Sequence, residues 1–276
     1  MNIKEILEFA EEQLPEAAHE AGWVCGHYLD LSNLDMRFLA NREVSEEQEK
    51  LIRMALKRRR QGEPLQYIFG EQPFMDFTLK VTTDTLIPRW DSEVVVEKAL
   101  SLIPKDEEKQ KDFRVADICT GCGTYALSLK YYRSQITVAA TDISEAALNV
   151  ARENAKTLQL ETEFLQGNLA EPLTGKFDLI VSNPPYIATD YLAELDADVQ
   201  QEPKLALDGG ADGLDFYRLL ALTVPEKLKK GGLLLVEIGC DQCQAVCKIM
   251  SDGGFVDLRF GQDYGGNDRW VLAAVQ

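Results

Sequence analysis

An apolar strand that runs into a glycine turn restricts the fold of this chain more than any other segment. Residues 113–123 read Phe-Arg-Val-Ala-Asp-Ile-Cys-Thr-Gly-Cys-Gly, and the apolar-periodic stretch Thr124–Tyr132 follows them. This order predicts the first strand and helix of a nucleotide-binding sheet. Gly121 and Gly123 allow the backbone to approach a ligand closely. Their spacing is not G-x-G-x-x-G, so a dinucleotide pyrophosphate is not the expected ligand.

Strand and helix patterns alternate from Glu93 onward. Such alternation predicts an α/β domain with a mostly parallel sheet, helices on both faces and a ligand crevice at the carboxyl ends of the strands. Before residue 70 there is no convincing strand. Stretches 3–14, 15–29 and 45–60 have the apolar periodicity of helices, whereas 35–39 reads as a short turn. A small all-helical domain therefore precedes the sheet, and it is expected to span residues 1–70.

A hairpin is expected to link the two domains, because residues 74–81 alternate between apolar and polar side chains. We assign residues 71–92 to this linker and residues 93–276 to the α/β domain. The mixed-charge run 105–111 reads as a solvated loop. Residues 189–212 form a long polar segment with Gly and Pro punctuation, which predicts a loop that covers the site or contacts the substrate, although it could also be a passive surface insertion.

Polar side chains are expected at the carboxyl ends of four strands. Asp142 follows the second strand, about twenty residues beyond the glycine turn, where an acid characteristically binds ribose hydroxyls. Asp117 ends the first strand, and Asn168 follows the strand Thr162–Gln166. Asn183 follows the apolar run 177–182. Because parallel strands end at one edge of a sheet, these four residues should lie near one crevice.

The tetrad Asn183-Pro184-Pro185-Tyr186 predicts a site for a planar, weakly nucleophilic NH2 group. The Asn183 side-chain carbonyl and the Pro184 backbone carbonyl can accept both hydrogens of such a group. Two consecutive prolines lack N–H donors and stiffen the turn that presents these carbonyls. Tyr186 offers a flat face for the planar group. Taken alone, an Asn-Pro dipeptide would more often be a simple strand-ending turn.

The glycine turn, the acid after the second strand and the Asn-Pro-Pro-Tyr tetrad together resemble a class I S-adenosylmethionine-dependent methyltransferase, with a Rossmann-like seven-stranded sheet. Further segments narrow the resemblance to the HemK-type family, which methylates the side-chain amide N(5) of glutamine in the Gly-Gly-Gln motif of class I peptide release factors. They are residues 64–70 (Pro-Leu-Gln-Tyr-Ile-Phe-Gly), 86–89 with Glu93, 202–217 and 232–239. The match runs from about Glu63 to the end of the sequence.

The resemblance implies a role for each candidate site residue. Asn183, Pro184 and Tyr186 would be the catalytic residues, and Pro185, Arg89 and Glu93 would complete the substrate-binding set. S-adenosylmethionine, which leaves as S-adenosylhomocysteine, would be the cofactor and no metal would be needed. The residues implied to bind this cofactor are Asp117, Thr120, Gly121, Gly123, Asp142, Ile143, Asn168 and Asn183.

The sequence departs from the family at three places. The usual Ile-Pro-Arg-Pro-Glu-Thr-Glu is here Ile87-Pro-Arg-Trp-Asp-Ser-Glu93, Cys119 stands where the family has glycine, and Asn168 stands where the superfamily usually has an acid. The last two strands, 256–260 and 269–275, match the reversed final hairpin of the methyltransferase fold by resemblance.

Charge favours a protein substrate over nucleic acid. The net charge of −17 argues against binding nucleic acid, which requires clustered Lys and Arg. The basic cluster 57–60 ends a helix that begins at Ser45 with Gln48 in capping-box spacing, so it reads first as solvated surface and only second as a docking patch. His19 and His27 read as surface or packing residues. No apolar run is long enough to cross a membrane and no signal-peptide pattern is present, so we expect a cytoplasmic protein. The resemblance implies class I release factors as its substrate, and we expect a monomer.

Other functions remain open from the sequence. Cys119-x-x-Cys122 and Cys240-x-x-Cys243 with Cys247 could indicate zinc, but reduced thiols are the preferred interpretation. The same amide site could serve another protein, such as a ribosomal protein. Asn-Pro-Pro-Tyr could also hold the exocyclic amine of a base, and a binding scaffold without activity is a further alternative.

Overall fold

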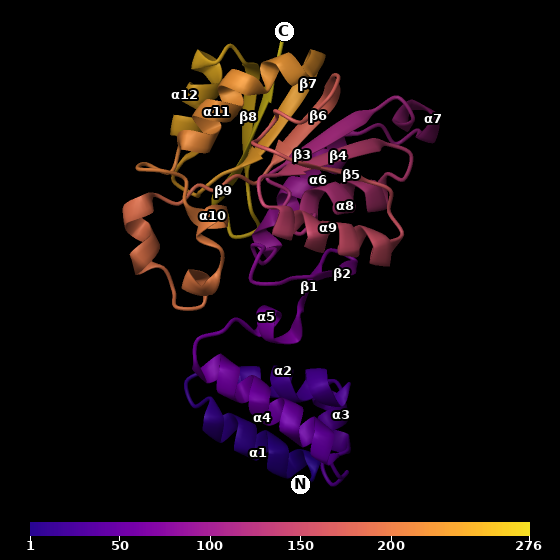
Figure 1. Cartoon of the computed structure of the whole chain (residues 1–276), viewed down its shortest axis with the longest axis vertical. Coiled ribbons are helices and arrows are strands. Elements are labelled where there is room, and N and C mark those ends of the chain that lie inside the picture. The colour runs from indigo at the N-terminus through magenta and orange to yellow at the C-terminus, as the bar shows by residue number, and fades with distance from the viewer. The chain divides into compact units, whose positions relative to one another are not determined.

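The computed structural model describes all 276 residues and divides into two compact units (Figure 1). The first unit consists of Met1–Gly70 with Asp196–Gln201. The second consists of Glu71–Leu195 with Glu202–Gln276. The α/β architecture with a preceding helical part agrees with the fold expected from the sequence. No helix has the length and apolar content that crossing a membrane requires.

The first unit contains only helices. They are α1 (Ile3–Gln13), α2 (Ala18–Leu29), α3 (Asn33–Phe38), α4 (Glu46–Arg60) and α5 (Leu65–Phe69). Residues 35–39 were expected to form a short turn, but residues 35–38 belong to α3 and Leu39 is its C-cap. The helix forms because Ser32 and Asp35 make a capping box, in which each side chain accepts the backbone N–H of the other residue. Helix α2 begins three residues later than expected, since a turn closed by the Ala17 N–H and the Leu14 carbonyl precedes it.

The sequence of helix α4 contains a stabilising feature at each end of the helix. Ser45 and Gln48 form the expected capping box, and the basic cluster 57–60 occupies the last turn, where positive charge favours the helix dipole. Arg58 pairs with Glu63, and Arg59 pairs with Glu20 at 2.5 Å. These arginines therefore have partners inside their own unit.

The second unit is built on a seven-stranded sheet. Its strands are β3 (Arg114–Ile118), β4 (Thr137–Asp142), β5 (Glu163–Gln166), β6 (Phe177–Ser182), β7 (Leu228–Glu237), β8 (Val256–Gln262) and β9 (Asp268–Ala274). The spatial order is β5-β4-β3-β6-β7-β9-β8. Strand β9 runs antiparallel to both of its neighbours, β7 and β8, as the reversed final hairpin requires, and the remaining pairs of this sheet are parallel. The order reverses at β3, and this point lies between β4 and β6. Open α/β sheets bind ligands at such a reversal.

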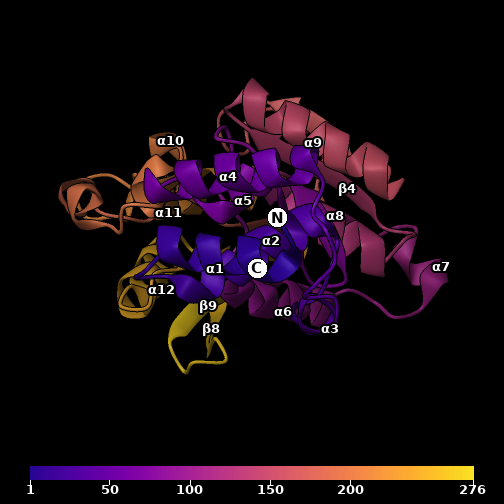
Figure 2. The ribbon, with the colours of Figure 1, turned by 90° about the horizontal axis from the view of Figure 1, so that it is seen from below.

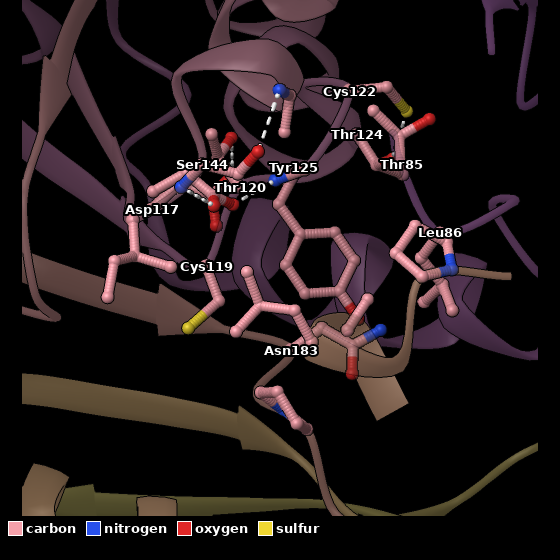
Figure 3. Close-up of a pocket in the computed structure, with 18 of the residues that line it drawn as sticks. Thr85, Leu86, Asp117, Cys119, Thr120, Cys122, Thr124, Tyr125, Ser144 and Asn183 are labelled. Atoms are coloured by element: carbon pink, nitrogen blue, oxygen red, sulfur yellow. Dashed lines mark hydrogen bonds between the residues drawn. The ribbon is translucent and has the colours of Figure 1, made fainter. Parts of the chain in front are cut away.

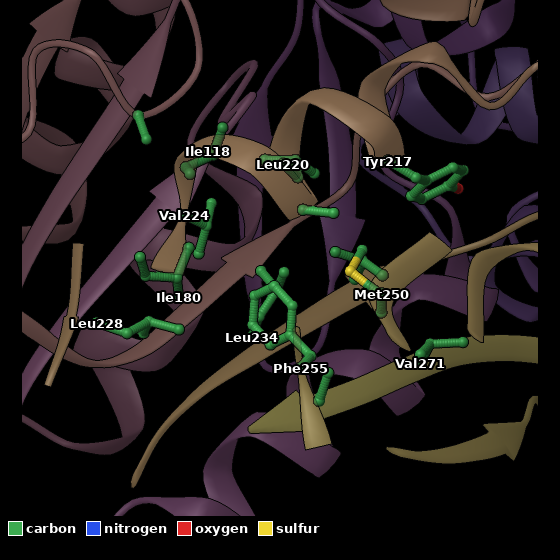
Figure 4. Packing of buried hydrophobic residues seen from close by; sticks show 14 of the residues in the cluster. Ile118, Ile180, Tyr217, Leu220, Val224, Leu228, Leu234, Met250, Phe255 and Val271 are labelled. Atoms are coloured by element: carbon green, nitrogen blue, oxygen red, sulfur yellow. The ribbon is translucent and has the colours of Figure 1, made fainter. Parts of the chain in front are cut away.

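Helices cover both faces of this sheet. The elements between the strands are η1 (Trp90–Ser92), α6 (Glu93–Leu102), α8 (Thr124–Tyr132), α9 (Glu145–Leu158), α11 (Asp215–Thr223), η4 (Pro225–Lys227) and α12 (Cys243–Asp252). Helices α8 and α9 lie side by side, as do α11 and α12, in both views (Figure 1, Figure 2). Figure 4 shows the core between the sheet and α11 and α12, where Leu220 and Met250 meet Ile180, Leu234 and Phe255. Burial on both faces explains the continuous apolar runs of the central strands.

A short hairpin opens the second unit. Strands β1 (Glu71–Phe74) and β2 (Phe77–Lys80) pair across a two-residue turn, so the alternating stretch 74–81 contains the turn and only the second strand. Met75 has a φ of 50° in this turn. Its N–H donates to the Glu93 carboxylate at 2.9 Å, which ties the hairpin to the start of α6. The polar residue Asn154 on α9 accepts the Lys80 N–H at 2.7 Å and fixes the other side.

Two segments expected to be loops contain short helices. The run 105–111 includes α7 (Glu107–Gln110), which begins because the Asp106 side chain accepts the Glu108 N–H. The long segment 189–212 includes η2 (Thr189–Glu194), η3 (Val199–Gln201) and α10 (Lys204–Leu207). It is therefore more ordered than its polar sequence indicated.

Candidate active site

A pocket of about 260 Å³ opens at the carboxyl edge of the sheet in the second unit. Nine of the candidate residues line it: Arg89, Asp117, Thr120, Gly121, Asp142, Ile143, Asn168, Asn183 and Pro185. They are brought together because β3, β4 and β6 are parallel neighbours and end at the same edge. Figure 3 shows Asp117, Thr120 and Asn183 with the other labelled lining residues.

The glycine turn after β3 presents bare backbone to this pocket. Gly121 has a φ of 56°, and a Cβ placed on it would meet no atom within 4 Å. The turn is thus open on its ligand side, which suits a molecule that packs directly against the main chain. Cys119, at the family's glycine position, also has a positive φ of 63°. Burial raises the pKa of its thiol, which therefore stays protonated.

Asp117 anchors the glycine turn after β3 through hydrogen bonds of its side chain. Its side chain is 1% exposed. One oxygen, Oδ2, accepts both the Thr120 hydroxyl at 2.6 Å and the Ala126 N–H at 3.0 Å. Burial raises the pKa of Asp117 to about 7 in spite of these two hydrogen bonds, which oppose the shift. Asp117 therefore connects the end of β3 to the turn and to the first residues of α8.

Asp142 ends β4 and faces the same turn. Its Oδ2 accepts the Gly121 N–H at 2.9 Å, and its Oδ1 accepts the Ser144 N–H at 2.9 Å. Each oxygen keeps a further lone pair for a ligand hydroxyl. Burial raises the pKa of this carboxyl. The next residue, Ile143, lines the pocket although its side chain is 52% exposed, and so it offers apolar surface to a ligand.

Asn183 lies directly after β6, and its side chain is half-buried in the pocket. Its amide makes no hydrogen bond to any other group of the protein, unlike the carboxylates of Asp117 and Asp142. Its carbonyl and NH2 group are therefore available to a ligand that enters the pocket.

The rest of the tetrad is fixed by its surroundings. Pro184 and Pro185 are buried. A Cβ on Gly209 would lie 2.7 Å from the Tyr186 Cα, so the following loop approaches the tetrad at a distance that only glycine permits. The Tyr186 carbonyl accepts the side-chain NH2 of Gln242 at 2.9 Å. Pro184 and Tyr186 themselves are not among the lining residues.

Arg89 and Glu93 have different positions. Arg89 lines the pocket and forms an ion pair with Glu202, whose side chain is 1% exposed. The second Glu202 oxygen accepts the Ile87 N–H at 2.9 Å, so this pair joins two loops at the mouth of the pocket. Glu93 lies outside the lining and holds the hairpin turn instead. Gly123 is also outside, and a Cβ there would lie 2.8 Å from Leu127, which indicates close helix packing.

Several pocket residues were not identified from the sequence. Ser92 and Tyr125 line the pocket together with the apolar side chains of Leu205, Phe216 and Leu219. Glu237 lies behind them at the end of β7, and its side chain accepts the Tyr125 hydroxyl. An acid inside the apolar run 233–238 is the one sequence signal that could have indicated a buried polar cluster here.

Cysteine and histidine take no part in a metal cluster. All six thiols are free, and no group of three or more His, Cys, Asp or Glu side chains is arranged to hold an ion. His27 stacks on Phe69 with ring centroids 4.2 Å apart, and His19 meets Trp23 edge to face. Both histidines belong to the first unit.

The lining residues fit a nucleoside cofactor. The open glycine backbone, an acid with two spare lone pairs and the exposed face of Ile143 are the features that accept a ribose and a base. The unpartnered Asn183 amide lies in the same pocket and can take a second polar molecule. The arrangement can therefore bring a nucleoside donor and an NH2-bearing acceptor together.

Comparison with known proteins identifies the family. The sequence model described as "Methyltransferase small domain" matches residues 94–201, and the one described as "PrmC N-terminal domain" matches residues 5–70. A Release factor glutamine methyltransferase of Moorella thermoacetica is 49% identical over 79% of this chain and 77% of its own length. One of Geobacter sulfurreducens is 38% identical over 98% of this chain and 95% of its own length.

A solved structure supports the fold independently. The methyltransferase from Pyrococcus furiosus superposes with a TM-score of 0.54 at 17% identity, covering 71% of this chain and 87% of the other. The identity of this pair is low, so it speaks for the fold alone. The two family models match the helical part and the α/β part of the sequence, and the two relatives are 49% and 38% identical to it. The chain therefore belongs to the release factor glutamine methyltransferase family.

Proposed function

We propose that this protein transfers a methyl group from S-adenosylmethionine to the side-chain amide nitrogen of the glutamine in the Gly-Gly-Gln motif of class I peptide chain release factors. The observation that carries the proposal is the Asn183 amide, which lies in the pocket without a protein partner, beside a turn and an acid suited to a nucleoside. Family membership supports the same reaction.

The acceptor amide is poorly nucleophilic because its nitrogen lone pair is spread into the carbonyl. We infer that the Asn183 side-chain carbonyl and the Pro184 backbone carbonyl accept its two N–H hydrogens. Held in this way, the nitrogen cannot rotate and presents one face to the donor. Tyr186 and Pro185 limit the movement of the amide plane. Orientation and exclusion of water then provide most of the rate.

The other lining residues hold the donor. When bound, S-adenosylmethionine supplies an electrophilic methyl group on a positively charged sulfur. Asp142 would accept the ribose hydroxyls, Ile143 would cover the base and Asn168, which also lines the pocket, would contact the base edge. Thr120 and Gly121 would pack against the amino-acid part, with Asp117 fixing the turn beneath them. Asn183 would contact both molecules. S-adenosylhomocysteine would be the second product, and no metal would take part.

The amide nitrogen would form a bond to the methyl carbon while the methyl–sulfur bond breaks, and the electron pair of that bond would remain on the sulfur. The methylated amide would then carry the positive charge and release its extra proton to water, so no strong base would be needed. Arg89 stands at the mouth of the pocket and would contact the substrate chain. We further infer that the helical unit recognises the release factor, since a Gly-Gly-Gln loop offers few contacts of its own. Glu93 would act on this substrate only through the hairpin that it anchors.

We also infer that the protein acts as a monomer in the cytoplasm, where translation factors are found. Its net charge of −17 disfavours direct contact with nucleic acid. Residues 1–70, 71–92 and 93–276 would then be the recognition domain, the linker and the catalytic domain.

Methyl acceptors can be compared directly. The protein is incubated with radiolabelled S-adenosylmethionine and, separately, a class I release factor, its Gln→Ala variant, a ribosomal protein and nucleic acid. We expect label on the release factor that disappears with the glutamine. Label on the ribosomal protein or the nucleic acid, with none on the release factor, would contradict the proposed substrate.

A further inference from the structure

The buried carboxyl group of Glu237 lies behind the pocket, next to the hydroxyl groups of several tyrosine side chains. Glu237 is 2% exposed and ends β7. Its carboxylate accepts the Tyr125 hydroxyl and, at 3.4 Å, the Tyr186 hydroxyl. Ser92 also lowers the pKa of this carboxyl group, against the effect of burial, and the Tyr217 hydroxyl donates to the Glu237 backbone carbonyl at 2.9 Å. The carboxylate therefore accepts tyrosine hydroxyls from two separate segments of the chain.

The strand register places this acid beside the acceptor site. Ser182, the last residue of β6, pairs with Val236 of β7, so Asn183 directly follows one strand of this parallel pair and Glu237 ends the other. Tyr125 lines the pocket while its hydroxyl reaches back to the carboxylate. Figure 3 shows the Tyr125 ring and Asn183 among the lining side chains. The cluster thus contacts the pocket through the groups that it orients.

Stability alone does not require an acid at this position. Burial raises the pKa of Glu237, because removing a carboxylate from water is costly. Apolar side chains in place of the whole polar cluster would fill such a space without that cost. Fully satisfied buried networks do fix side chains in one arrangement. The arrangement fixed here is that of Tyr125 and of Tyr186, the last residue of the tetrad.

We propose that Glu237 is a positioning residue for methyl transfer, which acts through the hydroxyls of Tyr125 and Tyr186. It fixes the Tyr125 ring in the pocket wall and the Tyr186 ring at the end of the tetrad. This inference rests on the proposed function. Glu237 does not touch the reacting atoms. It sets the angle of the two aromatic rings, and its negative charge lies behind the site in which positive charge passes from the donor sulfur to the amide.

The variants Glu237→Gln and Tyr125→Phe test this role by steady-state kinetics with a release factor. The amide keeps the shape of Glu237 but gives up one acceptor and the charge. We expect Glu237→Gln to lower kcat by roughly tenfold or more, while KM and the cofactor Kd stay within about threefold. Tyr125→Phe should lower kcat less. The kcat of the double variant should lie within about twofold of that of Glu237→Gln, since both changes disrupt the same hydrogen bond between Tyr125 and Glu237.

Asp178→Asn is the matched control. Asp178 lies at the opposite end of β6, where its carboxylate accepts the Arg114 N–H at 2.8 Å and the Lys229 ammonium at 2.7 Å. We expect this variant to lose thermal stability but to keep kcat within about twofold. A kcat loss in Glu237→Gln no larger than in the control, or fully multiplicative losses in the double variant, would overturn the inference.

The same series separates this inference from the proposed function. Wild-type protein that leaves the release factor unmethylated contradicts both. Active wild-type protein with normal kcat in Glu237→Gln contradicts the role of Glu237 alone. If Glu237→Gln does not fold, the pair Tyr125→Phe and Tyr186→Phe decides, because both keep the ring. Loss of kcat in these variants at unchanged cofactor Kd supports the role, and unchanged kcat in both refutes it.

Discussion

Replacing Asp142 by alanine should weaken cofactor binding by an amount that follows from its contacts. Each carboxylate oxygen already accepts one backbone N–H at 2.9 Å, from Gly121 and from Ser144. One lone pair per oxygen remains, so two ribose hydroxyls can each donate one charge-assisted hydrogen bond. Such bonds contribute about 1.5–3 kcal/mol each, and water that enters the vacated space recovers part of this. We expect a net loss of about 2–4 kcal/mol, or roughly a 30- to 900-fold rise in Kd.

Isothermal titration calorimetry with S-adenosylhomocysteine measures this loss. Asp84→Ala is the matched control, because Asp84 is an exposed carboxylate that also lines the pocket. Its carboxylate accepts the Thr82 hydroxyl, and its own backbone N–H donates to that same hydroxyl. We expect a change of less than about threefold in that variant, since a general loss of negative charge is screened by water. An unchanged Kd in folded Asp142→Ala, or equal losses in both variants, would refute the reasoning.

Three further predictions concern other parts of the chain. Deleting residues 1–62 should leave cofactor binding intact but raise KM for full-length release factor far more than KM for a short Gly-Gly-Gln peptide. If KM rises equally for both substrates, in a truncated protein that circular dichroism shows to be folded, the helical unit contributes to stability and not to recognition. Burial raises the pKa of Asp117 from 3.8 to about 7, so the folded protein binds this proton more tightly than the unfolded chain does. The resulting contribution to the free energy of unfolding is fully present below pH 3.8 and is lost as the pH rises through 7. The side-chain oxygen that remains in Asp117→Asn can still accept both hydrogen bonds, and the substituted side chain carries no charge at any pH. In urea titrations the free energy of unfolding of this variant should therefore increase relative to that of the wild-type protein as the pH rises through this window. A difference that does not change with pH would contradict this. Cys119→Gly should raise the free energy of unfolding by up to about 1 kcal/mol, because glycine adopts the φ of 63° without strain, and a marked loss in urea titration would show that the thiol stabilises the turn.

The sequence predicted the parts of the fold that depend on local patterns. The buried strand before the glycine turn and the alternation after Glu93 were sufficient for the parallel sheet, because strand periodicity and turn residues are short-range signals. The capping box at Ser45 was found for the same reason. The helix at Asn33–Phe38 was missed although Ser32 and Asp35 carry the capping-box spacing, since the apolar stripe of so short a helix is weak.

The pocket wall could not be predicted in the same way. Tyr125 reaches Glu237 from an element 112 residues away in sequence, and no local pattern reports such a contact. Arg89 was identified, but its partner Glu202 was known only as part of a motif, because the pair joins two distant loops. Side-chain contacts between distant segments depend on packing that the sequence alone does not show.

The most direct test of the account compares wild-type protein with Asn183→Ala in single-turnover methyl transfer to a release factor. Cofactor is kept saturating, and mass spectrometry locates the methyl group. We expect the wild-type protein to methylate the glutamine side-chain amide, and the variant to be slower by more than roughly a hundredfold while its cofactor Kd changes only a few-fold. Near-normal transfer by Asn183→Ala, or a methyl group on any other atom, would contradict the proposal that the unpartnered Asn183 amide holds the acceptor.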